Sequence, residues 1–170
     1  MNVRQALKKL LKRNQLLVAP GCFDGLSARL VQEAGFEAAY LSGGAVARSM
    51  GIPDIGLVTM SESIERAAQV VSAIQIPVIA DADTGYGNAV NVHYTVKEYI
   101  RAGAAGLHIE DQESPKKSGT LAGRRLISRE EAVGKYKAAV AAKKELDPDF
   151  VICARCDSIG SERGNFEDAV

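Results

Sequence analysis

Tryptophan is absent from this 170-residue chain, and its aromatic residues amount to five tyrosines and four phenylalanines. So few rings argue against a surface on which nucleic-acid bases stack. An excess of one charge is also missing, because 21 lysines and arginines face 21 aspartates and glutamates, which gives a formal net charge of zero. This balance argues against electrostatic binding of nucleic acid or of an anionic membrane. We therefore expect neither partner.

Long hydrophobic runs and a disulfide framework are lacking as well. No apolar stretch reaches the roughly 20 residues of a membrane-spanning helix, and the basic N-terminal stretch lacks the apolar centre of a signal peptide. Three cysteines are an odd number and are typical of a reducing compartment. With 46% hydrophobic residues, the chain can bury a core. These features predict a compact cytoplasmic protein.

Short apolar runs alternate with helix-forming segments along the chain. The runs predict strands at residues 16–19, 38–41, 77–80, 107–109 and 150–154. Apolar periodicity and capping residues predict helices over about 3–11, 25–34, 59–74, 92–102 and 128–146. Such strands, rich in valine, isoleucine, leucine and alanine, indicate a parallel sheet covered by helices.

Two α/β architectures fit this alternation, an open doubly wound sheet and a (β/α)₈ TIM barrel. A doubly wound sheet gathers its site at one point, whereas a barrel uses all its strand ends. Polar residues follow every predicted strand here, namely Cys22, Asp24, Ser42, Asp81, Asp83, Glu110, Asp111, Arg155 and Asp157. We therefore favour a barrel, with residues 1–170 as a single domain. Because a barrel usually needs about 250 residues, we expect an N-terminal fragment with about five βα units.

The densest chemical motif is the segment 81–87, which contains two aspartates two residues apart. Alternate residues of a strand point to the same face, so Asp81 and Asp83 project together. Carboxylates this close repel each other unless a cation or a proton lies between them, and oxygen ligands with water suit Mg²⁺. Glu110, at the end of the next strand, can join through a water. The alternative is that one aspartate caps a helix and the other accepts backbone hydrogen bonds.

Two further strand ends offer groups for an anionic ligand. Ser42, Gly43 and Gly44 let the backbone approach an anion closely, or they form a tight turn. Arg155 can bind a carboxylate through two parallel hydrogen bonds, or it can pair with an internal acidic side chain.

The segment 111–127 is long and shows no periodicity. Loops of this length in compact domains are usually functional, and a basic, glycine-containing loop beside an acidic site is typical of a closing lid. A disordered surface loop is the alternative. The residues of interest are Lys116, Lys117, Ser118, Gly119 and Thr120.

The cysteine and histidine residues suggest no site of their own. Cys153 and Cys156 match a C-x-x-C motif, but residues three apart on a strand face opposite ways, so we expect neither a redox pair nor a zinc site. His93 is expected on a helix surface and His108 in the packing of a strand.

Several motifs in one order resemble the isocitrate lyase/phosphoenolpyruvate mutase superfamily, and methylisocitrate lyase-like members in particular. They are the segments 23–28, 40–44, 81–88, 108–112, 115–120 and 154–157. The resemblance implies a (β/α)₈ barrel that assembles as a homotetramer. It also implies that Mg²⁺, with Mn²⁺ as a substitute, is bound together with a small carboxylate substrate.

The resemblance also implies roles for individual residues. The metal ligands would be Asp81, Asp83 and Glu110. The substrate would contact Ser42, Gly43, Gly44, Asp54, Gly119 and Thr120, with Asp54 also near the metal through water. The catalytic residues would be Arg155, Glu110, Ser118 and Lys117.

The activity implied is a Mg²⁺-dependent lyase that cleaves a C–C bond of a small 2-hydroxy or 2-keto di- or tricarboxylic acid, such as 2-methylisocitrate, through a metal-stabilised enolate. Lyases of this family carry a cysteine in the mobile loop, where Ser118 stands here, and a serine hydroxyl is far less acidic than a thiol. Oxaloacetate decarboxylation or phosphonopyruvate and phosphoenolpyruvate chemistry, which needs no thiol, is the alternative. A ligand-binding member with impaired catalysis is the third interpretation.

Overall fold

The computed structural model describes residues 2–169, which form a five-stranded parallel sheet. The strands are β1 (Gly21–Cys22), β2 (Ala39–Leu41), β3 (Val78–Asp81), β4 (Gly106–Glu110) and β5 (Val151–Arg155). Their order in the sheet is β1-β2-β3-β4-β5, the same as their order along the chain. A doubly wound sheet reverses its strand order at a switch point. The sequential order therefore confirms the preference for a barrel-type α/β fold.

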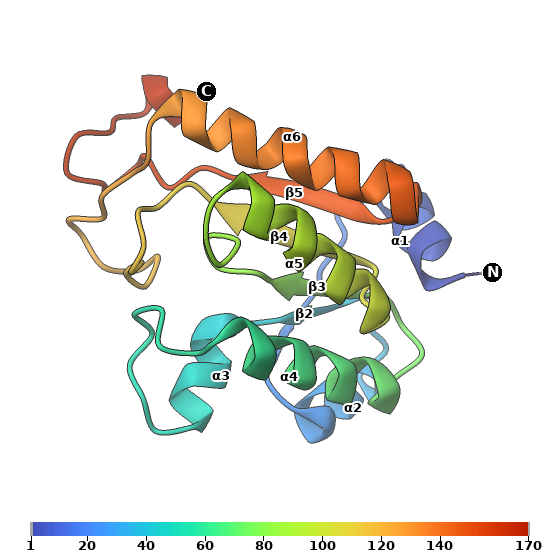
Figure 1. Ribbon diagram of the computed structural model, residues 1–170. Coiled ribbons are helices and arrows are strands. Elements are labelled where there is room, and N and C mark those ends of the chain that lie inside the picture. Colours follow the sequence, from blue (N-terminus) through green and yellow to red (C-terminus); the bar gives the residue numbers. More distant parts are fainter. Residues whose placement is uncertain (1, 170) are drawn as a thin grey trace.

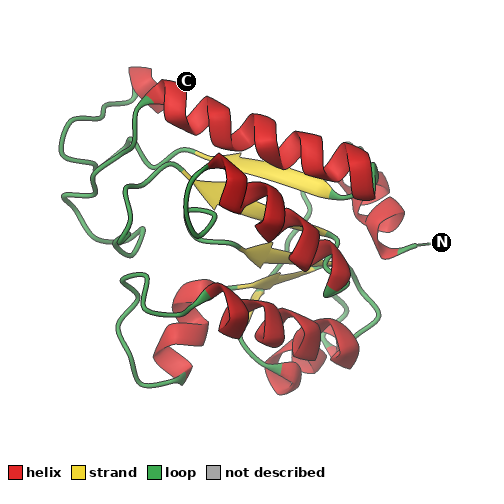
Figure 2. Ribbon diagram, viewed as in Figure 1, coloured by secondary structure: helices red, strands yellow, loops and turns green. Residues whose placement is uncertain are grey.

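The helices give a second indication of a barrel-type fold. They are α1 (Val3–Leu11), α2 (Gly25–Glu33), α3 (Gly43–Ser49), α4 (Met60–Ala73), α5 (Ala89–Arg101), α6 (Arg129–Leu146) and the 3₁₀ helix η1 (Glu167–Ala169). Helices α2, α4, α5 and α6 pack in sequence along one face of the sheet, and α5 and α6 make the most extensive helix contact (Figures 1 and 2). None of the helices in residues 2–169 is long and apolar enough to cross a membrane.

The two faces of the sheet differ in chemistry because side chains alternate along each strand. Leu107 and Ile109 of β4 are fully buried in the apolar core, together with Val96 and Tyr99 of α5. His108 and Glu110 point the other way, and the register partner of His108 in β3 is Asp81. The polar groups of the strands are thereby collected on the face away from the helices.

The first predicted strand is wrong. Residues 16–19 form no strand, and Leu16 is 88% exposed. Pairing begins instead at Pro20, whose carbonyl accepts a hydrogen bond from the Tyr40 N–H (3.0 Å), and continues through Gly21 and Cys22. Proline has no N–H to donate, but it fits an edge strand such as β1. The strand therefore begins just after the segment that was predicted to form it.

Two other local features differ from the prediction. Residues 43–49 form a short helix that the two glycines at its start concealed, since glycine is a weak helix former. Helix α5 begins three residues earlier than expected because Asn88 caps it reciprocally with Asn91. The four later strands and the remaining helices are confirmed with boundary shifts of one or two residues.

Helix α1 is fixed at the amino end of the sheet by Arg4. Its guanidinium donates to the carbonyls of Ala104 (3.0 Å) and Ile100 (2.5 Å) and pairs with Asp147 (2.5 Å). The same group lies over the ring of Phe150, 5.9 Å from the centroid. Phe150 thus connects α1 to the start of β5 and is itself fully buried.

Replacing Phe150 by alanine should lower the free energy of unfolding by about 3–5 kcal/mol, because it removes a buried ring and leaves a cavity. Denaturant unfolding of the full-length protein measures this. The matched control is Phe166→Ala, since Phe166 is 70% exposed, and it should change the value by less than about 0.5 kcal/mol. Equal effects of the two substitutions would contradict this account of the core.

Candidate active site

Acidic side chains converge at the carboxyl ends of β3 and β4. One potential ligand atom from each of Asp81, His108 and Glu110 lies within 4.8 Å of the other two, and all three residues are buried. Asp81 and Glu110 were predicted metal ligands, whereas His108 was expected to serve packing. His108 does stack on Tyr40, with 5.5 Å between centroids. His108 stands two residues before Glu110 on the same strand, and this spacing predicts that both side chains point to the same face.

Asp81 is held in the ionised form by hydrogen bonds. Its Oδ2 accepts from the Gly43 N–H and the Tyr40 hydroxyl (both 3.0 Å), and its Oδ1 accepts from the Asp83 N–H (3.0 Å). Burial opposes ionisation, but the charge of His108 and these bonds outweigh it, so the pKa of Asp81 lies below its usual value. A Cβ at position 43 would come within 2.9 Å of Asp81 Oδ2, so this contact requires glycine.

Asp83 lies in a turn of unusual backbone conformation. Asp83 and Tyr86 have positive φ angles of 45° and 59°, a region that costs free energy for residues other than glycine. Burial and the neighbouring Asp81 raise the pKa of Asp83. Its geometry therefore brings a second carboxylate to the first at an energetic cost that the surrounding structure must offset.

Helices α5 and α6 support this turn from behind. Three buried side chains donate to its backbone carbonyls: Tyr99 to Asp81 (2.8 Å), Thr95 to Gly85 (3.1 Å) and Lys135 to Thr84 (3.2 Å). Buried hydrogen bonds of this kind over-determine a strained conformation. The two helices thus fix the turn, and the turn fixes the positions of the Asp81 and Asp83 carboxylates.

The loop 111–127 lies over the acidic cluster through Lys116. The ammonium of Lys116 is 2.5 Å from Asp54 Oδ1 and 3.0 Å from Asp83 Oδ1, and its side chain is 6% exposed. Burial disfavours the ammonium, but Asp83 and Asp54 outweigh this effect and raise the pKa of Lys116. A Cβ at position 44 would come within 2.6 Å of Asp54, so the close approach of this carboxylate requires glycine there.

Lys117, a predicted catalytic residue, is not brought to the cluster. Its side chain is exposed, and its ammonium donates to the carbonyl of Gly123 (2.6 Å). The basic residue that reaches the carboxylates is Lys116, which the sequence analysis noted in the loop without assigning it a role. Two adjacent lysines in an irregular loop give no periodicity from which to choose between them.

The loop reaches Arg155 through Gly119. Ser118 is buried, and its Oγ is 3.2 Å from Thr120 Oγ1. Gly119 packs directly on the guanidinium of Arg155, which a Cβ at that position would overlap. Of the predicted group of Ser118, Gly119 and Thr120, Gly119 is therefore the residue next to the strand-end arginine, and Gly119 and Thr120 remain exposed.

Arg155 joins the ends of β4 and β5. Its Nε and NH2 donate to the two carboxylate oxygens of Asp157 (2.8 and 3.0 Å), and its NH1 is 3.0 Å from Glu110 Oε2. This is the internal pairing that the sequence analysis left as an alternative. The Arg155 side chain stays 31% exposed, whereas Glu110 is 1% exposed. Burial raises the pKa of Glu110 to about 8, against the opposing effect of Arg155.

Ser42 is used by the fold itself. Its Oγ caps α3 by accepting from the Ala45 N–H (3.3 Å), while the N–H of Gly43 is directed at Asp81. The tight approach expected from the serine and two glycines is thus present, with an internal carboxylate as the anion.

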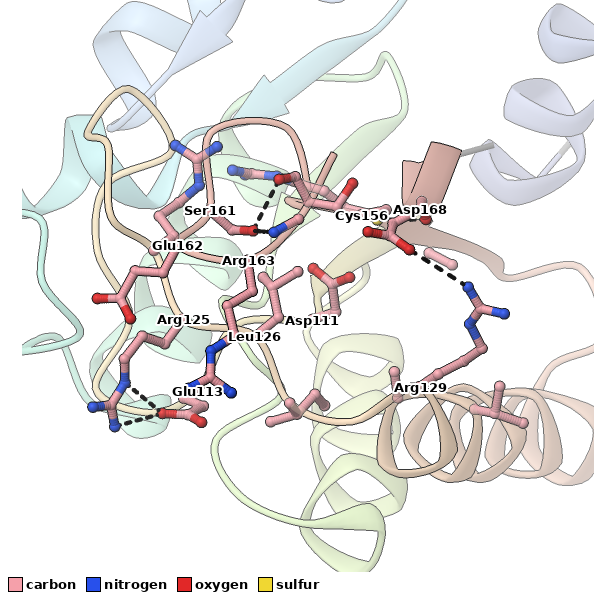
Figure 3. A pocket seen from close by; sticks show the side chains of 18 of the residues that line it. Asp111, Glu113, Arg125, Leu126, Arg129, Cys156, Ser161, Glu162, Arg163 and Asp168 are labelled. Carbon is pink, nitrogen blue, oxygen red and sulfur yellow. Dashed lines mark hydrogen bonds and ion pairs between the residues drawn. The ribbon is translucent and has the colours of Figure 1, made fainter. Parts of the chain in front are cut away.

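A cavity of about 590 Å³ lies between the loop 111–127, the start of α6 and the segment after β5 (Figure 3), and Arg155 is one of the residues that line it. Asp81, Asp83 and Glu110 are not among the described residues that line it. Its charges are largely matched, since Arg125 pairs with Glu113 (2.7 Å) and Arg129 with Asp168 (4.0 Å). The acidic cluster, where charge is crowded and buried, is the better candidate for chemistry.

Known proteins resemble the chain over nearly its whole length. A family model described as phosphoenolpyruvate phosphomutase matches residues 7–170. The chain is 48% identical to 2,3-dimethylmalate lyase of Eubacterium barkeri over 159 residues, which cover 93% of this chain and 54% of that protein. It is 46% identical to 2-methylisocitrate lyase of Aeropyrum pernix over 164 residues, 96% of this chain and 51% of that protein. The chain spans about half the length of these curated relatives.

Solved structures agree with the sequence relatives. A crystal structure of 2,3-dimethylmalate lyase superposes with a TM-score of 0.92 at 39% identity and covers 98% of this chain and 56% of that one. Oxaloacetate acetylhydrolase with 3,3-difluorooxalacetate gives 0.91 at 39% identity, with 98% and 57% covered. Phosphonopyruvate hydrolase with oxalate and Mg²⁺ gives 0.85 at 39% identity, with 93% and 53% covered.

The raised pKa of Glu110 predicts a pH dependence of stability. Its pKa is about 8 in the folded chain and near the ordinary value of 4.5 when the chain is unfolded, so the folded state holds the proton more tightly. The contribution of this group to the free energy of unfolding is therefore full below pH 4.5 and falls as the pH rises to 8. Glu110→Gln removes the titration.

Unfolding of the full-length protein and of Glu110→Gln in EDTA, at intervals from pH 5 to 8, measures this. The stability of the variant relative to the unsubstituted protein should increase steadily with pH. A constant or decreasing difference would contradict the assignment of the raised pKa.

Proposed function

The chain belongs to the phosphoenolpyruvate mutase/isocitrate lyase superfamily, and we propose that the protein it represents is a carbon–carbon lyase. Its substrate is a small 2-hydroxy or 2-keto di- or tricarboxylic acid of the 2-methylisocitrate kind. The observation that carries the proposal is the acidic cluster of buried Asp81 and Glu110 and partly buried Asp83 beneath a closed basic loop. Relatives named as lyases support the reaction class.

The residues of the cluster fit a divalent cation. Asp83 Oδ1 and Glu110 Oε2 are buried and accept no hydrogen bond from any described residue, and cationic side chains contact both. Carboxylate oxygens are the donors that Mg²⁺ prefers, and Mn²⁺ accepts them too. Asp81, Asp83 and Glu110 would hold the ion, with Asp54 nearby. When bound, the ion supplies a Lewis acid for a carbonyl or alkoxide oxygen of the substrate.

Around that position, the chain's own residues orient charge and exclude water. Arg155 is partly exposed and stabilises negative charge that develops on the substrate. Lys116 closes the loop by its pairs with Asp54 and Asp83, which shields the site from solvent. Lys116 takes the place for which Lys117 was predicted. Gly43 and Gly44 serve the site by allowing Asp81 and Asp54 to approach the backbone closely.

Two groups are placed to move the proton. Without the ion, the pKa of Glu110 is about 8, and binding of the ion would release its proton and leave a carboxylate that can act as a general base. Ser118 is buried in the loop, and its hydroxyl lies within hydrogen-bond distance of the Thr120 hydroxyl. Because its hydroxyl is a weak acid, we assign the proton transfer to Glu110 and a hydrogen-bonding role to Ser118.

A second candidate reaction follows from the same loop. The paired hydroxyls of Ser118 and Thr120 supply no acidic thiol. Conversion of oxaloacetate or phosphonopyruvate needs none, and solved structures named for these substrates superpose on the chain.

The homotetramer implied by the sequence resemblance stays a prediction.

Turnover of the full-length protein tests the proposal. The substrates are 2-methylisocitrate, isocitrate, 2,3-dimethylmalate, oxaloacetate and phosphonopyruvate, and released 2-keto acid is detected with lactate dehydrogenase. We expect cleavage of a hydroxy acid that EDTA abolishes and Mg²⁺ restores. Turnover confined to oxaloacetate or phosphonopyruvate would establish the second candidate, and no turnover on any of the five would overturn the proposal.

The substitution Ser118→Cys separates the two reactions. A thiol at this position offers a stronger acid, so cleavage of the hydroxy acid should rise by about tenfold, roughly the gain that one better-matched proton donor provides. Conversion of oxaloacetate should not rise. The control is Ser72→Cys, an exposed serine on α4, which should leave both rates unchanged.

A further inference from the structure

Gln112 is a fully buried polar side chain to which the proposed reaction gives no role. It follows Glu110 by two residues, at the start of the loop 111–127, and is 1% exposed. Its backbone forms an isolated antiparallel bridge with Leu126, which closes the base of the loop. A buried amide side chain needs several hydrogen-bond partners, and the partners of Gln112 come from three separate segments.

The first set of contacts is with the backbone of Lys117. Gln112 Oε1 accepts from the Lys117 N–H (2.9 Å), and Gln112 Nε2 donates to the Lys117 carbonyl (3.0 Å). One side-chain amide thus satisfies both backbone groups of one loop residue, as a neighbouring strand would. The side chain of Lys117 extends outward to Gly123, so its backbone is the part of this residue that is fixed to the site.

The second set of contacts is with two carboxylates. Gln112 Nε2 is also 2.7 Å from Asp157 Oδ2 and 3.1 Å from Glu110 Oε1, so its two N–H groups serve three acceptors and one N–H is shared. Asp157 is paired with the guanidinium of Arg155, and a hydrogen bond to such a carboxylate is stronger than a neutral one, so this amide is held firmly between the ends of β4 and β5. Its position is therefore set by the same acidic groups that contact Arg155.

We propose that Gln112 is a positioning residue that couples the closed loop to the acidic cluster. By holding the backbone of Lys117, it places the two flanking side chains, the ammonium of Lys116 over Asp83 and the hydroxyl of Ser118 in its buried position. That these groups serve turnover rests on the proposed function. The placement itself is a property of the fold and can be measured without a substrate.

Arg124 is a second anchor of the loop, so the contribution of Gln112 has to be distinguished from that of Arg124. Arg124 is buried and donates to the carbonyls of Gly119 (2.7 Å) and Leu121 (2.6 Å). If Arg124 alone keeps the loop in place, removing the amide of Gln112 will not loosen residues 116–118. If Gln112 is the anchor of that part, its removal will expose Lys116 even with Arg124 intact.

Limited trypsin digestion of the full-length protein distinguishes these answers, because Lys116 and Lys117 are cleavage sites inside the loop. In Gln112→Met, cleavage at these two lysines should accelerate at least tenfold relative to the unsubstituted protein. The kcat should fall about tenfold or more with a smaller change in KM, since reacting groups are displaced more than the substrate-binding backbone. The control is Gln32→Met, whose amide accepts from the Gln75 N–H far from the loop, and it should alter neither rate.

Gln112→Glu serves as a second variant that keeps the shape of the side chain and the acceptor for the Lys117 N–H but loses the donors. It should also accelerate cleavage at least threefold. Unchanged cleavage in whichever variant folds, with a melting temperature near that of the unsubstituted protein, overturns the inference even if kcat falls. Faster cleavage in a protein without turnover on any substrate supports the role of Gln112 and contradicts only the proposed function.

Discussion

The crowding of buried carboxylates at the carboxyl ends of β3 to β5 is the constraint on which the site depends. Asp54, Asp81, Asp83, Glu110 and Asp157 converge there, and Lys116 and Arg155 form ion pairs with four of them. Buried charges of one sign are costly unless a proton, a cationic side chain or a metal ion compensates them. The first two means are visible, the proton in the raised pKa of Glu110 and the cationic side chains in Lys116 and Arg155. Binding of a divalent cation would therefore change both the protonation and the ion pairs of the same residues.

Most of the fold could be predicted because its signals are local. Capping residues such as Thr59 and Ser128 mark where helices begin, and apolar runs mark the four later strands. The sequential order of strands followed from the polar residues at every strand end. The failures have physical reasons as well. The run at residues 16–19 is apolar but has no pairing partner, and the glycines at 43 and 44 serve a helix start packed against Asp81 and Asp54, a tertiary contact that composition does not reveal.

The candidate site could be predicted in its acidic half and less so in its basic half. Asp81 and Glu110 end their strands, where the period of a strand determines their direction, whereas Asp83 lies in the turn after β3 with a positive φ. The same reasoning applied to residues 40 and 108 would have found Tyr40 and His108, which contact Asp81. Which of two adjacent lysines enters the site depends on the loop conformation, and that is set by Gln112 and Arg124 through contacts between distant segments. No periodicity records such contacts.

The central claim is that the strand-end carboxylates hold a divalent cation. Calorimetric titration of the full-length protein with Mg²⁺ near pH 7, in buffers of different ionisation enthalpy, tests it most directly. The account predicts saturable binding of one ion per chain with release of a proton, because Glu110 is protonated at that pH, and at least about tenfold weaker binding in Asp81→Asn. The absence of saturable binding, or equal affinity in Asp81→Asn, would contradict it.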